Sequence, residues 1–184
     1  RPERLRTIEL AGSLHFGPGM LGSASVYYTR VDGLLVQEPV ASCYAGSGPR
    51  QHFVNRGAAN VLGAEVSFSV RLRGGVTGFA SAAVTRADQT TAAGEAAPLP
   101  NSPTLIASAG AALPLWRDRL VASVRLHYVS ERLDYRLARV AESAYLRADA
   151  SLVARRILGG LFASVTVNNT LNVSYRDPVT SSEA

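Results

Sequence analysis

The sequence predicts an all-β chain: about eight long antiparallel strands in up-and-down order, a segment of a transmembrane β-barrel. Three observations predict this fold. Apolar and polar residues alternate over stretches longer than the usual soluble strand of about 5–6 residues, and no helical period interrupts them. The connections alternate between short and long, which is typical of outer-membrane barrels. Charged residues also occupy mid-strand positions on the polar faces, which suits a hydrated interior.

Residues 62–72 show the alternation most clearly. The apolar positions are Leu62, Ala64, Val66, Phe68, Val70 and Leu72, and the polar positions are Gly63, Glu65, Ser67, Ser69 and Arg71. A period of two over this length indicates a strand with one apolar and one wet face. The following Arg73-Gly74-Gly75 supplies glycines for a tight reversal, so we expect the next strand to return antiparallel.

The same alternation predicts the other strands. They are expected at residues 5–16, 20–35, 76–85, 104–113, 119–133, 144–156 and 161–168. Short turns are expected at 17–19, 73–75, 114–118 and 157–159, and long loops at 38–56, 87–102 and 134–143, with a loop-like tail from 169 to 184. Under this assignment the short turns face the periplasm and the long loops face the exterior.

Composition limits the alternatives. Hydrophobic residues make up 47% of the 184 residues and charged residues 18%, against about 25% charged in a usual soluble domain. No apolar run approaches the roughly 18 residues of a membrane helix, so a membrane crossing would have to use strands. The net charge of +5 comes from arginines scattered over the chain, so we expect no nucleic-acid partner. Cys43 is the single cysteine, which excludes an internal disulfide.

Alternation alone does not separate a membrane barrel from a soluble sandwich, because the two folds differ only in which face points inward. Aromatic residues favour the barrel. Tyr28, Tyr128, Tyr145 and Trp116 fall near predicted strand ends, where membrane barrels carry interfacial girdles. The order of turns places the start of the first strand and the end of the eighth on the exterior side. We therefore expect a piece of a larger barrel, without its earlier strands and its final strand.

Four short motifs occur in a fixed order along the chain. They are Arg1-Pro2-Glu3-Arg4 with Thr7-Ile8-Glu9-Leu10, Asn55-x-Gly57 with Gly63-x-Glu65, the prolines from Pro98 to Pro103, and Val167-Asn168-Asn169-Thr170-Leu171-Asn172 with Tyr175-Arg176-Asp177-Pro178. Their order and spacing resemble the C-terminal barrel portion of a TonB-dependent outer-membrane receptor, over residues 1–184.

This resemblance implies active transport. Such receptors lie in the outer membrane of Gram-negative bacteria and take up a scarce ligand, such as a ferric siderophore, with energy delivered through TonB. The implied partners are this ligand, outer-membrane lipid, TonB itself, and a plug domain that lies upstream in the same chain. No cofactor is implied. Two alternatives remain open: a passive outer-membrane diffusion barrel, and a soluble all-β binding module.

The predicted loop 38–56 is the candidate ligand site. Tyr44, Arg50, His52 and Phe53 stand there among flexible glycines and serines. Arginine offers a charged fork to an anionic ligand, and aromatic rings add contact area. The alternative is that Arg50 and His52 are solvated loop residues and that Phe53 is an interface anchor. We expect no enzyme and no metal site, because His15, His52 and His127 are far apart and no catalytic motif occurs.

One further expectation concerns Glu65. This residue lies on the polar face of the strand at 62–72, where a buried carboxylate is costly unless it is hydrated or paired. Arg71 and Arg86 are the candidate partners. Such an ion pair would set strand register, and a contact between Glu65 and a ligand is the alternative.

Overall fold

Long strands dominate the computed structural model, which describes residues 2–40, 50–90, 96–116, 119–133, 140–157 and 159–175. The strands are β1 (Arg4–Gly17), β2 (Met20–Val40), β3 (Arg50–Arg71), β4 (Thr77–Thr90), β5 (Ala96–Pro98), β6 (Leu105–Leu115), β7 (Leu120–Val129), β8 (Arg132–Leu133), β9 (Val140–Glu142), β10 (Tyr145–Ile157) and β11 (Leu161–Val167). A 3-10 turn, η1 (Arg73–Gly75), is the one helical element within these ranges. Among the described residues no helix has the length and apolarity to cross a membrane.

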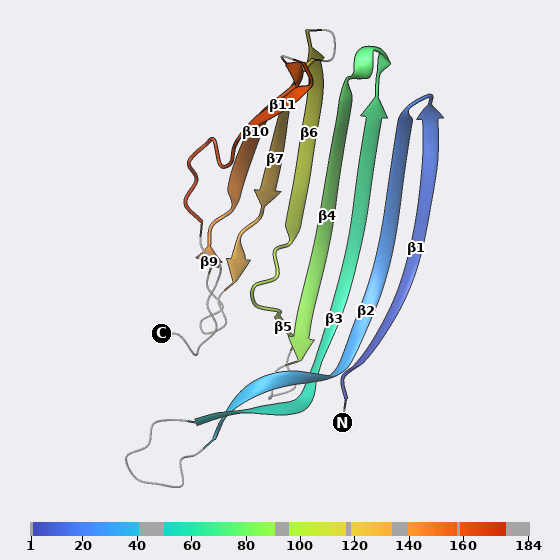
Figure 1. Ribbon diagram of the computed structural model, residues 1–184. Helices are drawn as coiled ribbons and strands as arrows, with labels where there is room; N and C mark the ends of the chain where they lie inside the picture. Colours follow the sequence, from blue (N-terminus) through green and yellow to red (C-terminus); the bar gives the residue numbers. More distant parts are fainter. Residues whose placement is uncertain are drawn as a thin grey trace.

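The long strands form one antiparallel sheet in the order β1-β2-β3-β4-β6-β7-β10-β11 (Figure 1). Each long strand pairs with the next long strand of the chain, β5 adds a short ladder to β4, and β8 and β9 form a separate two-stranded sheet. The strand ends that short turns join lie at one end of the sheet, at the top of Figure 1, and the strand ends that long connections join lie at the other. We call these the turn end and the loop end. The up-and-down, all-β prediction is therefore confirmed.

The register gives the sheet one polar and one apolar face. Residues directly opposite each other in an antiparallel pair share a face. On the polar face, Ser67 lies opposite both Ser23 and Ser81, while on the apolar face its neighbour Val66 lies opposite Ala24 and Ala82. The alternation expected for residues 62–72 continues across all eight long strands.

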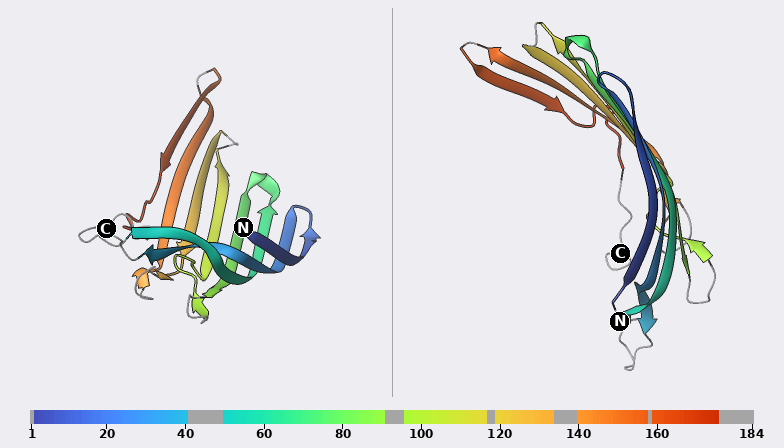
Figure 2. Two further views of the ribbon diagram at one scale, coloured as in Figure 1. Left: turned by 90° about the horizontal axis from the view of Figure 1, so that it is seen from below. Right: turned by 90° about the vertical axis from the view of Figure 1, so that its right-hand side faces the viewer.

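The sheet is a single curved layer without a conventional core (Figure 2). The buried hydrophobic residues among those described are Ala59, Ala87, Val129 and Ala148. Large apolar side chains are instead exposed: Ile8 is 78% and Leu10 is 75% accessible. A sandwich would cover this face with a second sheet, and none of the described elements does so. The apolar face is therefore an outer surface that no described element covers.

Four predicted loops or turns have wrong boundaries. The predicted loops at 38–56, 87–102 and 134–143 are too long. In the first, β2 continues to Val40 and β3 begins at Arg50. In the second, β5 pairs with β4, and in the third, β9 pairs with β8, which directly precedes that loop. The turn predicted at 114–118 begins too early, since Pro114 and Leu115 still pair with β7. Glycine, serine and proline suggested loops, whereas hairpin pairing extends the strands through them.

A joint interrupts the β2/β3 hairpin where the register shifts twice. Asp32 pairs with Ala58, Leu34 with Gly57 and Leu35 with Asn55, so each strand skips one residue. Gly33, the residue skipped in β2, has φ +73°, and a Cβ there would collide with the Asn55 side chain. Only glycine suits this position. Beyond the joint the hairpin bends and runs across the loop end of the sheet (Figures 1 and 2).

Candidate functional site

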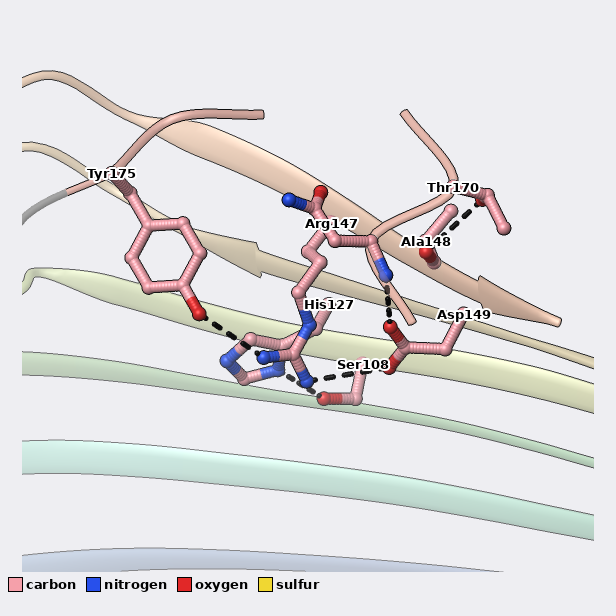
Figure 3. Close-up of polar contacts among 8 residues, drawn as sticks. Ser108, His127, Arg147, Ala148, Asp149, Thr170 and Tyr175 are labelled. Carbon is pink, nitrogen blue, oxygen red and sulfur yellow. Dashed lines mark hydrogen bonds and ion pairs between the residues drawn. The ribbon is translucent and has the colours of Figure 1, made fainter. Parts of the chain in front are cut away.

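The pairing of β7 with β10 concentrates charge on the polar face. Arg125 lies opposite Asp149, and His127 lies opposite Arg147. Alternate residues of a strand share a face, so the four side chains form a compact block, which we call the charged ridge. Ser108 of β6 and Tyr175 of the C-terminal segment border it (Figure 3).

Asp149 ties the ridge to the segment that follows β11. One carboxylate oxygen, Oδ2, accepts a hydrogen bond from Arg147 Nη2 at 3.3 Å, and the other, Oδ1, accepts from the Asn169 backbone N–H at 2.8 Å. The Asp149 side chain is 18% accessible. Arg147 also donates from Nη1 to the Tyr175 hydroxyl at 3.4 Å, and its Nε is buried without a partner. The guanidinium thus has unused hydrogen-bonding capacity.

The segment after β11 folds against β10. The Thr170 N–H and hydroxyl both donate to the Ala148 carbonyl, at 2.7 and 3.0 Å. The Asn169 side chain exchanges hydrogen bonds with the backbone of Val173, at 2.9 and 3.0 Å. Tyr175 then stacks on Tyr145, with ring centroids 4.5 Å apart and an interplanar angle of 10°.

This stack corrects the placement of one predicted girdle residue. Tyr145 lies opposite Val129 on the polar face, beside the charged ridge, and is therefore not part of a lipid-facing girdle. Tyr28 and Tyr128 do lie on the apolar face, opposite Leu62 and Leu146. Position near a strand end was not enough to assign Tyr145, because one step along a strand changes the face.

Ser108 and His127 lie close enough to invite comparison with a catalytic pair. The Ser108 hydroxyl and His127 Nδ1 are 2.9 Å apart. A serine-histidine-acid triad also needs a carboxylate that orients the imidazole. Within the described ranges no carboxylate contacts His127, and its neighbour on β10 is the cation Arg147. The pair therefore belongs to the polar wall and lacks the third member of a triad.

Two shallow hollows flank the ridge on the polar face. One, of about 380 Å³, is lined by residues that include Phe79, Arg125, Asp149, Ser151 and Asn168, and the Arg125 guanidinium lies 5.7 Å from the centre of the Phe79 ring. The other, of about 540 Å³, lies over β1 to β6, where serine and alanine predominate around Glu65. Small side chains leave space over β1 to β6, while cationic groups stand over β7 and β10.

The expected Glu65–Arg86 ion pair is wrong. Arg86 lies opposite Leu62, on the apolar face, and its Nε contacts Asp88 at 2.9 Å. Arg71 does share the polar face with Glu65, but six residues along an extended strand separate them by about 20 Å. Glu65 lies instead between Ser25 and Ala83.

Three of the four predicted ligand residues fall at the loop end. Tyr44 lies outside the described residues. Arg50, His52 and Phe53 lie in β3, where their backbones pair with Val40, Glu38 and Gln37 of β2. They therefore belong to a strand, and their contact with a ligand remains a prediction. In the described part of the chain, no three histidine, cysteine, aspartate or glutamate residues are grouped to hold a metal ion.

Comparison with known proteins agrees with the fold. The family described as TonB dependent receptor-like, β-barrel matches residues 1–171. No curated protein matches the chain. Among solved structures, the FrpB iron transporter from Neisseria meningitidis superposes with a TM-score of 0.69 at 19% identity, over 94% of this chain and 28% of its own.

Two further structures are similar. The ferric-catecholate import receptor Fiu from E. coli K12 gives a TM-score of 0.72 at 16% identity, over 97% of this chain and 25% of that one. The copper transporter OprC gives 0.74 at 18% identity, over 96% of this chain and 27% of that one. The chain spans only a quarter or slightly more of these proteins. Because the family match covers residues 1–171 and the sheet has the expected form, the chain belongs to the TonB-dependent receptor-like β-barrel family.

Proposed function

We propose that the chain forms part of the wall and outer hairpins of an outer-membrane receptor of a Gram-negative bacterium. The receptor takes up a scarce ligand, such as a ferric siderophore, with energy transmitted through TonB. One observation carries this proposal: a single-layer antiparallel sheet with a polar face on one side and an exposed apolar face on the other. In a closed barrel the polar face lines the lumen and the apolar face contacts lipid.

The dimensions of the apolar face support a membrane crossing. From Leu62 to Leu72 the strand advances about 33 Å along its axis, and a tilt of about 40° reduces this to a height of about 25 Å, the usual apolar band of such barrels. Aromatic side chains lie at both limits of this face. Tyr28 is opposite Leu62, and the rings of Phe16 and Phe68 lie 6.1 Å apart toward the turn end.

The ligand class follows from charge. Arg125 and Arg147 stand beside one carboxylate, Asp149, so the ridge favours an anionic, hydrogen-bonding ligand. At the loop end the β2/β3 hairpin crosses the sheet and carries Arg50, His52 and Phe53, which together with Tyr44 are the proposed first-contact residues. The similar structures are named for iron, ferric catecholate and copper, which makes a metal complex the first ligand to test.

The remaining parts of the receptor are proposed by family membership. A plug domain upstream in the same chain would close the lumen and contact TonB, and further strands, including a final one, would close the barrel. The described residues supply wall and outer hairpins, and their proposed role is binding and passage without catalysis. A passive diffusion barrel is the alternative, and it would need neither plug nor TonB.

Uptake by the full-length protein tests the proposal. Cells that lack other iron receptors would express the protein, and accumulation of radioactive iron would be measured with a panel of ferric siderophores. We expect accumulation of at least one complex, and we expect it to stop when tonB is deleted. Accumulation that continues without TonB would support the diffusion barrel and contradict active transport.

A paired substitution tests the loop-end residues. Arg50→Ala with His52→Ala should weaken ligand binding by about tenfold or more, because a hydrogen bond to a charged group contributes about 1.5–3 kcal/mol. The matched control is Arg71→Ala with His15→Ala, which removes the same residue types from the turn end. Binding to whole cells at equal surface levels is the measurement. Equal affinities of the two double variants would move the site to the plug or to other loops.

A further inference from the structure

The loop end of the apolar face carries a group of charged residues, which we call the arginine band. It consists of Arg4, Arg6, Arg30 and Arg86 together with Asp32 and Asp88. In β1, Arg4 and Arg6 alternate in step with the apolar residues Ile8 and Leu10, and Arg6 lies opposite Arg30. The band thus continues the apolar face beyond its last apolar row.

The arginine band has an excess of positive charge. Arg30 contacts Asp32 and Arg86 contacts Asp88, each at 2.9 Å, and both arginines remain mostly exposed. Arg4 and Arg6 are exposed and form no ion pair within the described ranges. Four guanidinium groups against two carboxylates leave two positive charges. A row of cations beside a lipid-facing surface attracts anionic lipid headgroups.

An apolar groove of about 760 Å³ lies on β1 and β2, which carry Arg4, Arg6 and Arg30 of the band, and is bordered by Phe68 of β3. Its floor is made of Gly12, Gly22 and Ala24, and its walls of Leu10, Leu14, Phe16, Val26 and Phe68. A Cβ on Gly12 would meet nothing within 4 Å, so the floor there is open. The Phe16 ring lies over Gly22, since a Cβ on that glycine would come within 2.7 Å of Phe16 Cε2. The Phe16 ring therefore covers the groove at its turn end, and the pair Leu10 and Val26 borders it on the side of the arginine band.

The spacing of band and groove fits one amphiphile. Leu10 follows Arg6 by four residues, about 13 Å along an extended strand. We propose that β1 and β2 bind a phosphate-bearing acyl lipid of the leaflet at the loop end, with its phosphate on Arg4 and Arg6 and one acyl chain in the groove. The arginine fork matches phosphate oxygens in pairs, and the glycine floor gives the chain a depression that a uniform leucine and valine surface lacks. The inference depends on the proposed membrane position of the chain.

Binding of lipid A to the detergent-purified full-length receptor tests this site. Fluorescent bisphosphorylated lipid A would be compared with the same lipid after removal of its phosphates, and inorganic phosphate would be added as a competitor. We expect tighter binding of the phosphorylated lipid and no displacement by equimolar inorganic phosphate. Equal binding of both lipids, or displacement by inorganic phosphate, would overturn the proposal.

Two variants test the phosphate contact and the acyl-chain contact of the lipid separately. Arg4→Gln with Arg6→Gln should weaken binding of phosphorylated lipid A about 25-fold, taking about fivefold for each arginine. Gly12→Leu should also weaken it by filling the groove. The controls are Arg71→Gln, at the turn end of the polar face, and Ala11→Leu, which adds the same bulk on the opposite face.

The outcomes are distinct from those of the uptake assay. Binding that is unchanged in either test variant, or reduced equally in its control, would overturn the single-lipid site. Normal TonB-dependent uptake in the same cells would then show that the receptor function stands without it. Specific lipid binding without any uptake would contradict the proposed function and leave the lipid site supported.

Discussion

Arginine placed on either face of one strand should distinguish the two faces at the same depth. Val66 and Ser67 are consecutive in β3, so Val66→Arg and Ser67→Arg introduce the same side chain on the apolar and polar faces respectively. Val66 is 55% exposed and stands about 13 Å from Leu62 and about 20 Å from Leu72 along the strand. It therefore lies near the middle of the apolar band.

The magnitudes follow from the surroundings of each residue. Arginine near mid-bilayer on the lipid face destabilises a barrel by about 2–4 kcal/mol. Ser67→Arg loses the 2.7 Å hydrogen bond to Ser23, which contributes about 0.5–1.5 kcal/mol. The new side chain can extend into the hollow of about 540 Å³ over β1 to β6. We expect Val66→Arg to be less stable than Ser67→Arg by about 1–3 kcal/mol.

Guanidinium unfolding of the full-length barrel in phospholipid vesicles measures this difference. Leu126→Arg against Ser123→Arg provides a second comparison, because Leu126 faces Ala109 and Ala148 on the apolar side, and Ser123 bonds Ser151 on the polar side. Equal free energies of unfolding within each pair would refute the assignment of the faces. A larger loss for the serine variants would reverse that assignment.

Two further predictions concern topology and the joint. In a Cys43→Ser background, an impermeant thiol reagent on whole cells should label Ser47→Cys and spare Gly74→Cys, and the reverse pattern would contradict the exterior placement of the loop end. Gly33→Ala should destabilise the barrel by about 1–2 kcal/mol, because φ is +73° there; Gly12→Ala, which meets open space, should change the unfolding free energy by much less, and equal losses would exclude the backbone strain as the cause.

The period of two was sufficient to predict the sheet. Once residues 62–72 are a strand, the glycines at 74 and 75 force the reversal, and both have positive φ in the structure. The two faces follow because polar and apolar residues also alternate in each partner strand, and the register places residues of the same kind opposite each other. Turn composition was less decisive: Pro114 suggested a turn, but it sits inside β6 opposite Val121.

The charged ridge and its borders could not be predicted from the sequence, because the four ridge residues come from two strands, and Ser108 and Tyr175 from a third strand and the tail. Ser108, His127 and Arg147 become neighbours only through the pairing of β6 with β7 and β7 with β10. The polar side chains at alternate positions, Arg125 with His127 and Arg147 with Asp149, were the available signal. Tyr175 gave none, since its stack on Tyr145 depends on the fold-back after β11.

The two skipped residues of the β2/β3 joint cancel each other. Before the joint Asp32 pairs with Ala58, and after it Leu35 pairs with Asn55, so the sum of paired residue numbers is 90 on both sides. Removing Gly33 alone would leave the outer part of the hairpin one residue out of step. Loss or gain of residues at this joint would therefore have to occur in both strands together. A matched pair of such changes would alter the direction of the outer hairpin while its pairing, and the wall beneath it, stayed the same.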